Sequence, residues 1–253
     1  MKFFLGTHDP SWLARTDVPL FISRRRLANR RALPRARGAW ALDSGGFTEL
    51  SLHGRWTIEP ERYADEVRRY ASEIGNLQFA AVMDWMCEPA IRVKTGLTVE
   101  EHQRRTIENF LRLRELAPEI RWAPVLQGWV MGDYIAHVAQ YARVGVDLRV
   151  LPVVGLGSVC RRQATMRIGH LLRWLHEDGI KLHAFGVKIG GLLSSAACLA
   201  SSDSMAWSLN ARRSPRRPGC THASCQNCLA YALEWRADLL DRLGAEERAA
   251  QSA

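Results

Sequence analysis

The chain has 253 residues, of which 47% are hydrophobic, and a formal net charge of +9 at neutral pH. This length suits one large α/β domain or two small ones, and the apolar content is ample for a sizeable core; we expect one principal domain over residues 1–253. No apolar run approaches the roughly 20 residues that a membrane span needs, and the N-terminus soon becomes polar without a cleavage site, so we expect a cytoplasmic protein without a membrane partner.

Apolar strand patterns alternate with amphipathic helical patterns along the chain. In order they are strands at 3–6, 20–23 and 39–43, a helix at 59–72, a strand at 79–84, a helix at 98–116, a strand at 122–127, a helix at 132–143, a strand at 148–154, a helix at 161–177, strands at 183–188 and ending near Asp203, and a helix at 229–243. The sequence Thr98-Val99-Glu100-Glu101 is typical of a helix N-terminal cap. Residues 244–253 look like a frayed, polar tail.

Repeated alternation of this kind favours a (β/α)8 TIM-type barrel, an α/β fold, with a doubly wound open sheet as the alternative. Several strands are almost wholly apolar, as expected when both faces of a parallel sheet are covered.

Polar or glycine residues follow four of the predicted strands at the point where each strand ends. They are Asp43 with Ser44, Gly45 and Gly46; Asp84; Gln127; and Gly155 with Leu156. In a barrel the carboxyl ends of all strands meet at one face, where loops build the active site. Each residue alone could also be a turn or helix-cap residue, and the Asp-Ser-Gly-Gly run could be a tight turn.

A further carboxylate, Asp203, stands between small side chains in the last strand. Together with Asp43 it forms a candidate pair, in which one carboxylate attacks as a nucleophile and the other handles a proton. The structural alternative for Asp203 is a helix N-cap in a serine-rich turn.

A cluster of metal-ligand residue types follows the last strand. Cys220, His222, Cys225 and Cys228 have the spacing C-x-H-x2-C-x2-C, which can wrap a tetrahedral Zn²⁺ in a structural site. We predict a zinc-binding subdomain at residues 212–243, inserted near the C-terminus. His222 or another residue would complete the shell, and the alternative is a set of reduced cysteines packed under a helix.

Arginine supplies most of the positive charge, in two groups. They are Arg24, Arg25, Arg26, Arg30, Arg31, Arg35 and Arg37, and Arg212, Arg213, Arg216 and Arg217. Because the guanidinium fork suits phosphate oxygens, these groups indicate a polyanionic partner; the alternative is a basic surface that is merely solvated.

In their order along the chain, these motifs resemble those of the tRNA-guanine transglycosylase superfamily, most closely its DNA-acting branch, the 7-deazaguanine DNA transglycosylases called DpdA. Asp43-Ser44-Gly45-Gly46-Phe47 resembles the signature loop of that family, and Gln127-Gly128 resembles its glutamine-glycine pair. The order of motifs puts Asp203 at the nucleophile position and the cysteine cluster at the zinc site. Residues 6–13 and 23–26 resemble the DNA-acting branch, which favours DNA over tRNA.

The resemblance implies a base exchange, in which guanine in DNA is replaced by a 7-deazaguanine base, most closely the 7-cyano form, through a covalent aspartyl-glycosyl intermediate. Asp203 would be the nucleophile and Asp43 would handle the proton. The substrate-binding residues that it implies are Ser44, Gly45, Gly46, Asp84, Gln127, Gly155 and Leu156. The target nucleotide must be flipped or single-stranded, which makes a DNA-opening ATPase or helicase a candidate partner.

Two other functions stay open at this point. One is a tRNA-guanine transglycosylase-like enzyme that acts on RNA, and the other is a non-catalytic, zinc-containing nucleic-acid-binding protein. The aspartate pair argues against the second, because binding to phosphate does not need it and carboxylates would oppose it.

Overall fold

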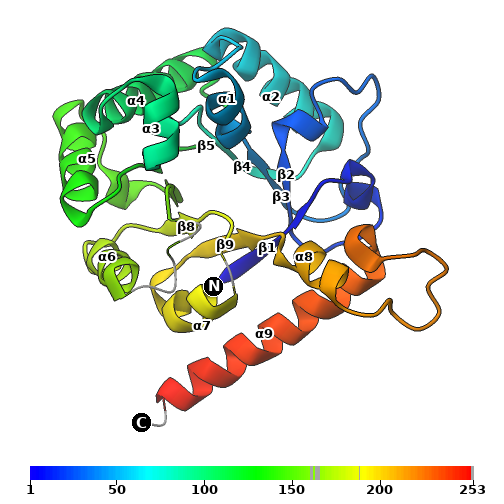
Figure 1. Ribbon diagram of the computed structural model, residues 1–253. Helices are drawn as coiled ribbons and strands as arrows, with labels where there is room; N and C mark the ends of the chain where they lie inside the picture. Colours follow the sequence, from blue (N-terminus) through cyan, green and yellow to red (C-terminus); the bar gives the residue numbers. More distant parts are fainter. Residues whose placement is uncertain (160–161, 163–165, 188, 252–253) are drawn as a thin grey trace.

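Parallel strands surrounded by helices form a nearly closed barrel, which Figure 1 shows along its axis in a computed structural model. The structure describes residues 1–159, 162, 166–187 and 189–251. The strands are β1 (Lys2–Thr7), β2 (Leu20–Ser23), β3 (Trp40–Asp43), β4 (Leu77–Ala81), β5 (Trp122–Ala123), β6 (Val125–Leu126), β7 (Val154–Leu156), β8 (Leu182–Ala184) and β9 (Ser201–Ser204).

The order of the strands accounts for the closure. It runs β5-β4-β3-β2-β1-β9-β8-β7-β6, and every pair is parallel. Its two ends, β5 and β6, are separated in the chain only by Pro124, which has no N–H to donate to a ladder and so interrupts one strand. The predicted (β/α)8 barrel is therefore confirmed, and the open doubly wound sheet is excluded.

Helices follow most of the strands. They are α1 (Gly46–His53), α2 (Pro60–Ile74), α3 (Pro89–Thr95), α4 (Val99–Leu116), α5 (Met131–Arg143), α6 (Met166–Glu177), α7 (Ile189–Ser195), α8 (Ala206–Arg213) and α9 (Leu229–Gln251). The predicted cap of α4 is confirmed, because Thr98 Oγ1 accepts a hydrogen bond from the Glu101 N–H at 3.1 Å. The first two connections differ from the regular pattern: they contain only short 3₁₀ turns, at Pro10–Ala14 and Arg24–Arg26.

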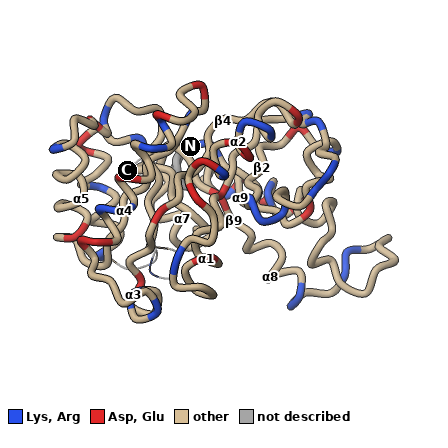
Figure 2. Tube along the Cα trace, turned by 90° about the horizontal axis from the view of Figure 1, so that it is seen from above, with Lys and Arg blue, Asp and Glu red and all other residues tan. Residues whose placement is uncertain are grey.

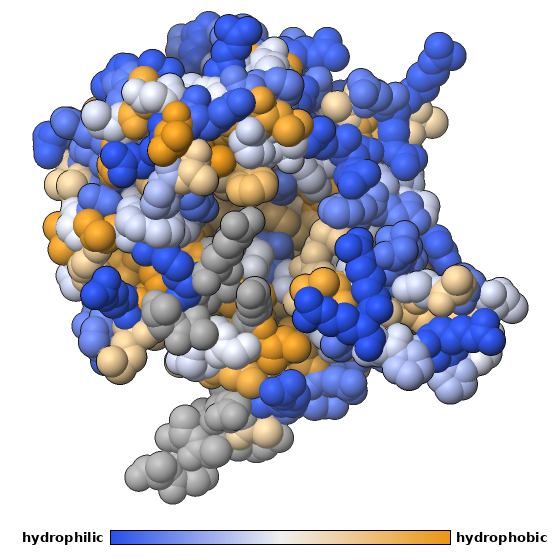
Figure 3. Space-filling view, in the orientation of Figure 1, coloured by the Kyte–Doolittle hydropathy of each residue, from blue (hydrophilic) through white to orange (hydrophobic). Residues whose placement is uncertain are grey.

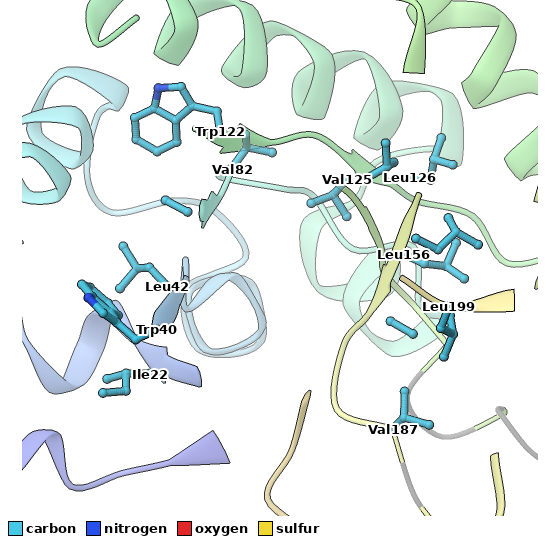
Figure 4. Packing of buried hydrophobic residues seen from close by; sticks show 14 of the residues in the cluster. Ile22, Trp40, Leu42, Val82, Trp122, Val125, Leu126, Leu156, Val187 and Leu199 are labelled. Atoms are coloured by element: carbon cyan, nitrogen blue, oxygen red, sulfur yellow. The ribbon is translucent and has the colours of Figure 1, made fainter. Parts of the chain in front are cut away.

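Large side chains on the outer faces of the strands attach the helices to the barrel. Figure 4 shows Trp40 and Trp122 pointing away from the strands, toward the helices. The Trp122 indole donates to Ala117 O at the end of α4 at 2.9 Å, and its ring lies 5.6 Å from that of Tyr63 in α2. This packing holds the strands in register and so fixes which residues face the barrel interior.

Phenylalanine fills the lower part of the barrel interior. Phe4, Phe21 and Phe79 are buried there with Ala41 and Ala123, one inward position from each of five strands. Since successive side chains alternate between faces, the residue two positions further along each strand points into the same interior, nearer the carboxyl ends.

Several strands and one helix differ in extent from their predictions. The strand predicted at 79–84 ends at Ala81, because the Asp84 N–H turns back to Val82 O at 2.9 Å. In the range 148–154, Leu148–Val150 is a 3₁₀ turn, because the Asp147 carboxylate accepts from the Arg149 N–H at 3.0 Å; the strand starts only at Val154.

Two further predictions concern the C-terminal half. The strand predicted at 183–188 runs over Leu182–Ala184, and Lys188 lies outside the described residues. Helix α6 is described from Met166 onward, so the predicted helical start at residue 161 also lies outside them. The expected frayed tail is wrong as far as Gln251, because α9 continues through alanine, glutamate and arginine, which favour helix.

No helix in the described part of the chain is both long enough and apolar enough to cross a membrane.

Candidate active site at the carboxyl mouth of the barrel

Asp43 and Asp203 both face the barrel interior near its carboxyl mouth. Asp43 lies two residues beyond the inward-facing Ala41 in β3, and Asp203 lies in β9, on the other side of β1 and β2. The two carboxylates are close enough for the charge of Asp203 to raise the pKa of Asp43. In the orientation of Figure 1, Figure 3 shows a recess in the middle of the molecular face, inside the ring of helices. The fold therefore brings together Asp43 and Asp203, the two carboxylates that the sequence predicts as a pair.

Asp43 is held by donors from both sides. It accepts hydrogen bonds from the Ser23 hydroxyl, its neighbour in register on β2, and from the Gly45 N–H. Burial raises the pKa of Asp43 above its ordinary value; these two hydrogen bonds oppose the rise, and the charge of Asp203 adds to it. A carboxyl with a raised pKa spends more of its time protonated near neutral pH, as a proton donor requires.

Asp203 is held by the turn after β8. Its Oδ1 accepts from the Gly186 N–H at 2.9 Å, and its backbone oxygen accepts from the Val187 N–H at 3.0 Å. Only 7% of the residue is exposed. The N-cap alternative is excluded, because Asp203 lies inside β9 and the N-cap of α8 is Met205.

Asp84 lies just beyond β4, and side chains from two other loops contact both of its carboxylate oxygens. The Ser44 hydroxyl donates to Oδ1 at 3.3 Å, and the Gln127 amide Nε2 donates to Oδ2. Burial raises the pKa of Asp84 to about 7, the negative charge of Asp43 adds to the rise, and the hydrogen bond from Gln127 opposes it. Asp43, Asp84 and Asp203 thus form one chain of acidic groups around the mouth.

The backbone of Gln127 is fixed from behind by a second row of polar side chains. Its N–H donates to His137 Nδ1 at 2.9 Å, and its carbonyl accepts from Gln103 Nε2 at 2.7 Å. Burial lowers the pKa of His137 to about 3, so this ring is neutral. The Gln127 amide oxygen accepts from the Ser158 hydroxyl at 2.6 Å. One N–H of its NH₂ group points to Asp84, which leaves a second donor on the same nitrogen.

The two glycines after Asp43 have separate structural reasons. Gly45 has a φ of 83°, and α1 starts directly after it. A Cβ on Gly46 would lie 3.2 Å from Asp84 Oδ1 and 3.1 Å from the Trp56 ring. The Asp-Ser-Gly-Gly run thus connects the end of β3 directly to the start of α1, and it brings the loop against the Asp84 carboxylate.

Gly155 and Leu156 lie in β7, in the wall of the barrel. The Gly155 N–H donates to Pro124 O within the sheet at 2.7 Å, and a Cβ here would lie 2.6 Å from the Phe185 ring. Leu156 is fully buried. Their predicted contact with a base stays a prediction.

Three residues near the aspartates were missed by sequence reasoning. Ser23 donates to Asp43, Ser158 donates to Gln127, and His183 lies with its Nε2 3.4 Å from Asp203 Oδ1. The position of Ser23 at the end of an apolar strand is the same signal that identified Asp43. His183 gave no such signal, because it lies inside a strand pattern.

Cys220, His222, Cys225 and Cys228 form a group that could hold a metal ion. Their ligand atoms all lie within 4.8 Å of one another. The Sγ atoms of Cys220 and Cys228 are 4.0 Å apart, close to the separation of about 3.8 Å expected for two thiolates on one tetrahedral Zn²⁺. The Arg217 N–H donates to Cys225 Sγ at 3.3 Å, as second-shell donors do at thiolate sites. His222, left open above, is the fourth member, with Nε2 3.2 Å from Cys225 Sγ.

Arginines from both groups lie near the mouth. A Cβ on Gly45 would meet Arg25 Cγ at 3.0 Å, so Arg25 lies against the loop that carries Asp43. Partial burial lowers the pKa of His8, and the positive charges of Arg26 and Arg212 lower it further, so both arginines lie near it. Figure 2 shows basic residues in the loops around β2 and in the segment after α8.

Fold and site together define a parallel barrel with three aspartates at its carboxyl mouth, two of them buried, and a Cys₃His cluster beyond the last strand. The family model DpdA, described as "DeoxyPurine in DNA protein A", matches residues 1–249, and the chain belongs to this family. The family is related to tRNA-guanine transglycosylase, which confirms the resemblance drawn from the sequence.

Other comparisons add less. Among curated proteins, none matches the chain. Two crystal structures of a "putative isomerase" from Sinorhizobium meliloti, one of them in an open-loop conformation, share 14% identity with it at a TM-score of 0.42. The match covers 79% of this chain and 49% of each of those chains, so this chain spans about half their length.

Proposed function

We propose that this protein exchanges guanine in DNA for a 7-deazaguanine base, most closely 7-cyano-7-deazaguanine, through a covalent bond between Asp203 and the sugar. The observation that carries the proposal is the shared interior position of Asp43 and Asp203, beside a third carboxylate, Asp84, that is held by Ser44 and Gln127. Family membership supports the choice of a purine in DNA as substrate.

Base recognition falls to the Asp84 side of the mouth. An ionised carboxylate accepts from the ring N–H and the amino group of a guanine-type edge, and these two donors are shared by guanine and its 7-deaza relatives. The second N–H of the Gln127 amide can donate to the carbonyl of the base. Ser44, Gly45 and Gly46 hold the loop against Asp84, and Gly155 and Leu156 of β7 would contact the base through their backbone.

In the first half-reaction the Asp203 carboxylate attacks the sugar carbon C1′. A C1′–O bond forms, the C1′–N9 bond breaks, and its electron pair leaves with guanine. Asp43, whose raised pKa favours the protonated form, gives its proton to the departing base. The protein then holds the DNA strand as a glycosyl ester.

In the second half-reaction the deazaguanine base enters the same pocket. The Asp43 carboxylate takes the proton from N9 of the base, N9 attacks C1′, and the ester bond breaks to regenerate the Asp203 carboxylate. One N-glycosidic bond is broken and another is made, so the exchange needs no external energy source. Asp43 ends each cycle protonated, as it began.

The basic residues near the mouth support a nucleic acid as the substrate. Arg25, Arg26 and Arg212 are exposed, and within the described part of the chain no carboxylate forms an ion pair with them. Their guanidinium groups can contact phosphates on both sides of a flipped nucleotide whose base enters the recess. A DNA-opening ATPase or helicase would supply such a nucleotide from a duplex.

The Cys₃His cluster is proposed as a structural Zn²⁺ site in a subdomain at residues 212–243. Its loop packs on α8, where the Ser208 hydroxyl donates to Gln226 O at 2.8 Å. In turn the Trp207 indole donates to Gly6 O at 2.8 Å, at the end of β1 beside β9. The metal would stabilise the helix that follows the nucleophile strand and takes no part in the chemistry.

Mass spectrometry of nucleosides tests the proposal. Single-stranded DNA, duplex DNA and tRNA are each incubated with the protein and 7-cyano-7-deazaguanine, then digested. We expect the deazaguanine nucleoside in DNA, with stoichiometric release of guanine, and none with Asp203→Asn. Incorporation into tRNA alone would replace DNA by RNA as the substrate, and absence of any exchange on all three would refute the proposal.

A further inference from the structure

His183 is a fully buried histidine directly beneath the proposed nucleophile. It lies in β8, and the register between strands pairs it with Ser201 of β9. Four phenylalanine rings surround it, with centroids 4.9 to 5.9 Å from its own: Phe4, Phe21, Phe79 and Phe185. An imidazole in such an apolar cage has few possible polar partners, so each of its two nitrogens can be accounted for.

One nitrogen has a partner in β9. Nδ1 lies 2.8 Å from Ser201 Oγ, and the hydroxyl can either donate to it or accept from it. The other nitrogen, Nε2, is buried and makes no hydrogen bond to any described residue. It nevertheless lies close to Asp203, with Nε2 and Oδ1 3.4 Å apart.

The charge of the Asp203 carboxylate favours one position for the proton on the His183 ring. If Nδ1 carried the proton, the lone pair of Nε2 would face a carboxylate oxygen across 3.4 Å, with no donor between them. If Nε2 carries the proton, the N–H faces that oxygen and the Ser201 hydroxyl donates to Nδ1. The low dielectric inside the phenylalanine cage enlarges the difference in favour of the second arrangement.

We propose that His183 is a positioning residue, whose Nε2–H is reserved for Asp203 Oδ1 and thereby leaves Oδ2 as the oxygen that attacks the sugar. This inference rests on the proposed function. Oδ1 already accepts from the Gly186 N–H at 2.9 Å, so two donors would fix this oxygen, while Oδ2 accepts no hydrogen bond from the described residues. Hydrogen bonds of catalytic groups are often long in the free protein and shorten in the complex, as the 3.4 Å separation requires here.

The same contact serves both half-reactions. After Oδ2 has bonded to C1′, Oδ1 is the carbonyl oxygen of the ester and still accepts from both N–H groups. When the ester breaks, the electron pair of the C1′–O bond returns to the carboxylate, and the two donors stabilise the recovered charge. Ser201 contributes by fixing the ring, and as a buried residue at the start of β9 it has no access to substrate.

Two variants of nearly equal volume separate the donor from the packing. His183→Gln keeps an N–H that can reach Oδ1, whereas His183→Met fills the same space without a donor. We expect His183→Met to slow formation of the covalent DNA adduct in a single turnover by about 10- to 100-fold, and His183→Gln to stay within about 5-fold of wild type. Affinity for DNA should not change in either variant. Phe79→Leu, which disturbs the same cage, should leave the adduct rate within about 2-fold while lowering the midpoint of thermal unfolding.

Equal adduct rates for His183→Gln and His183→Met, or a wild-type rate for His183→Met, would overturn the inference. A second readout needs no activity: ¹⁵N NMR of histidine-labelled protein, with the His183 signals assigned by their loss in His183→Gln. We expect a proton on Nε2, and an Nε2 without a proton would overturn the inference. If wild type forms no adduct with any DNA, the proposed function fails, and the NMR result still decides the role of His183.

Discussion

The carboxylates on the two sides of the barrel mouth differ in the hydrogen bonds that their oxygens accept. On the β3–β4 side, both oxygens of Asp84 accept hydrogen bonds from side chains, and Gln127, one of the donors, is itself held by His137, Gln103 and Ser158. On the β8–β9 side, one oxygen of Asp203 has one hydrogen bond within 3.0 Å and the other has none from the described residues. A fully satisfied polar network is rigid and suits a surface that reads a base edge, whereas a nucleophile needs an oxygen that is free to form a new bond.

The largest effect should come from the side that we assign to bond formation. Asp203→Asn keeps the size of the side chain but removes the attacking carboxylate, so exchange should fall by at least about 10³-fold. Single-turnover assays with the matched variant Asp241→Asn, which changes a carboxylate in the distant helix α9, should give the wild-type rate. Substantial exchange by Asp203→Asn would show that Asp203 is not the nucleophile.

Asp43 stands between the two sides, and its loss should affect both half-reactions. In Asp43→Asn the departing guanine has no proton donor and the incoming base has no acceptor for its N9 proton, so each half-reaction should slow by about 10²- to 10⁴-fold, and the adduct that does form should persist. Rapid-quench sampling on denaturing gels measures the adduct with time after the base is added. An adduct that disappears at the wild-type rate would contradict the proton role.

Asp84→Asn should weaken base binding and stabilise the protein at the same time. An amide cannot accept from two adjacent donors of the base, so we expect KM for the base to rise about 10- to 100-fold. The pKa of Asp84 is raised to about 7, so between about pH 4 and 7 the folded state binds more protons than the unfolded state, and the free energy of unfolding of wild type falls as pH rises.

Asp84→Asn has no carboxyl group to ionise at this position, so its free energy of unfolding should not fall in this way as pH rises. At pH 8 the variant should be more stable than wild type by about 1–3 kcal/mol, and the difference should shrink toward pH 4, where the wild-type carboxyl is protonated. Urea unfolding at the two pH values measures it. If the difference in free energy of unfolding between variant and wild type is the same at pH 4 and pH 8, the buried charge of Asp84 does not destabilise the folded protein.

Removing the metal should lower stability without changing the chemistry of either side. Cys225→Ala, or prolonged treatment with a chelator, should lower the midpoint of thermal unfolding by about 5–10 °C. Cys198→Ala is the matched control, because Cys198 is partly buried and lies outside the cluster. One zinc per chain in wild type, and less in Cys225→Ala, is expected by elemental analysis; wild-type protein free of metal and equally stable would exclude the site.

The smallest effect should come from the arginines at the rim. Replacing Arg25, Arg26 and Arg212 together by glutamine should weaken DNA binding uniformly across sequences and reduce the slope of log Kd against log salt by about 2–3. Arg104→Gln in α4 is the control, because Arg104 already pairs with Glu101 and Glu108. An unchanged slope in the triple variant would place the DNA elsewhere.

Sequence patterns predicted the Asp84 side better than the Asp203 side, and for a physical reason. Asp43, Asp84 and Gln127 each follow an apolar strand, so their place at the mouth follows from local pattern and from the shared direction of parallel strands. The contact between His183 and Asp203 depends instead on the register of β8 against β9, which the closing of the whole barrel determines. The sequence near His183 alone does not determine this register.

Strand ends were harder to predict than strands. The stretch from Leu148 to Val150 has the composition of a strand, but a hydrogen bond from the Arg149 N–H to the Asp147 side chain turns it into a 3₁₀ segment. The Cys₃His cluster was easier to predict than the strand ends, because its spacing within nine residues is nearly sufficient to define the group. The strand ends were mispredicted because single hydrogen bonds, such as the one between Asp147 and Arg149, decide where a strand stops, and composition does not reveal them.

The most direct test of the account is the identity of the residue that carries the sugar. Wild-type protein is mixed with a guanine-containing DNA oligonucleotide without the deazaguanine base, denatured, digested, and mapped by tandem mass spectrometry. We predict a deoxyribosyl ester on the peptide that contains Asp203, with free guanine released in equal amount. An ester on Asp43 or Asp84, or release of guanine with no adduct on any peptide, would contradict the account.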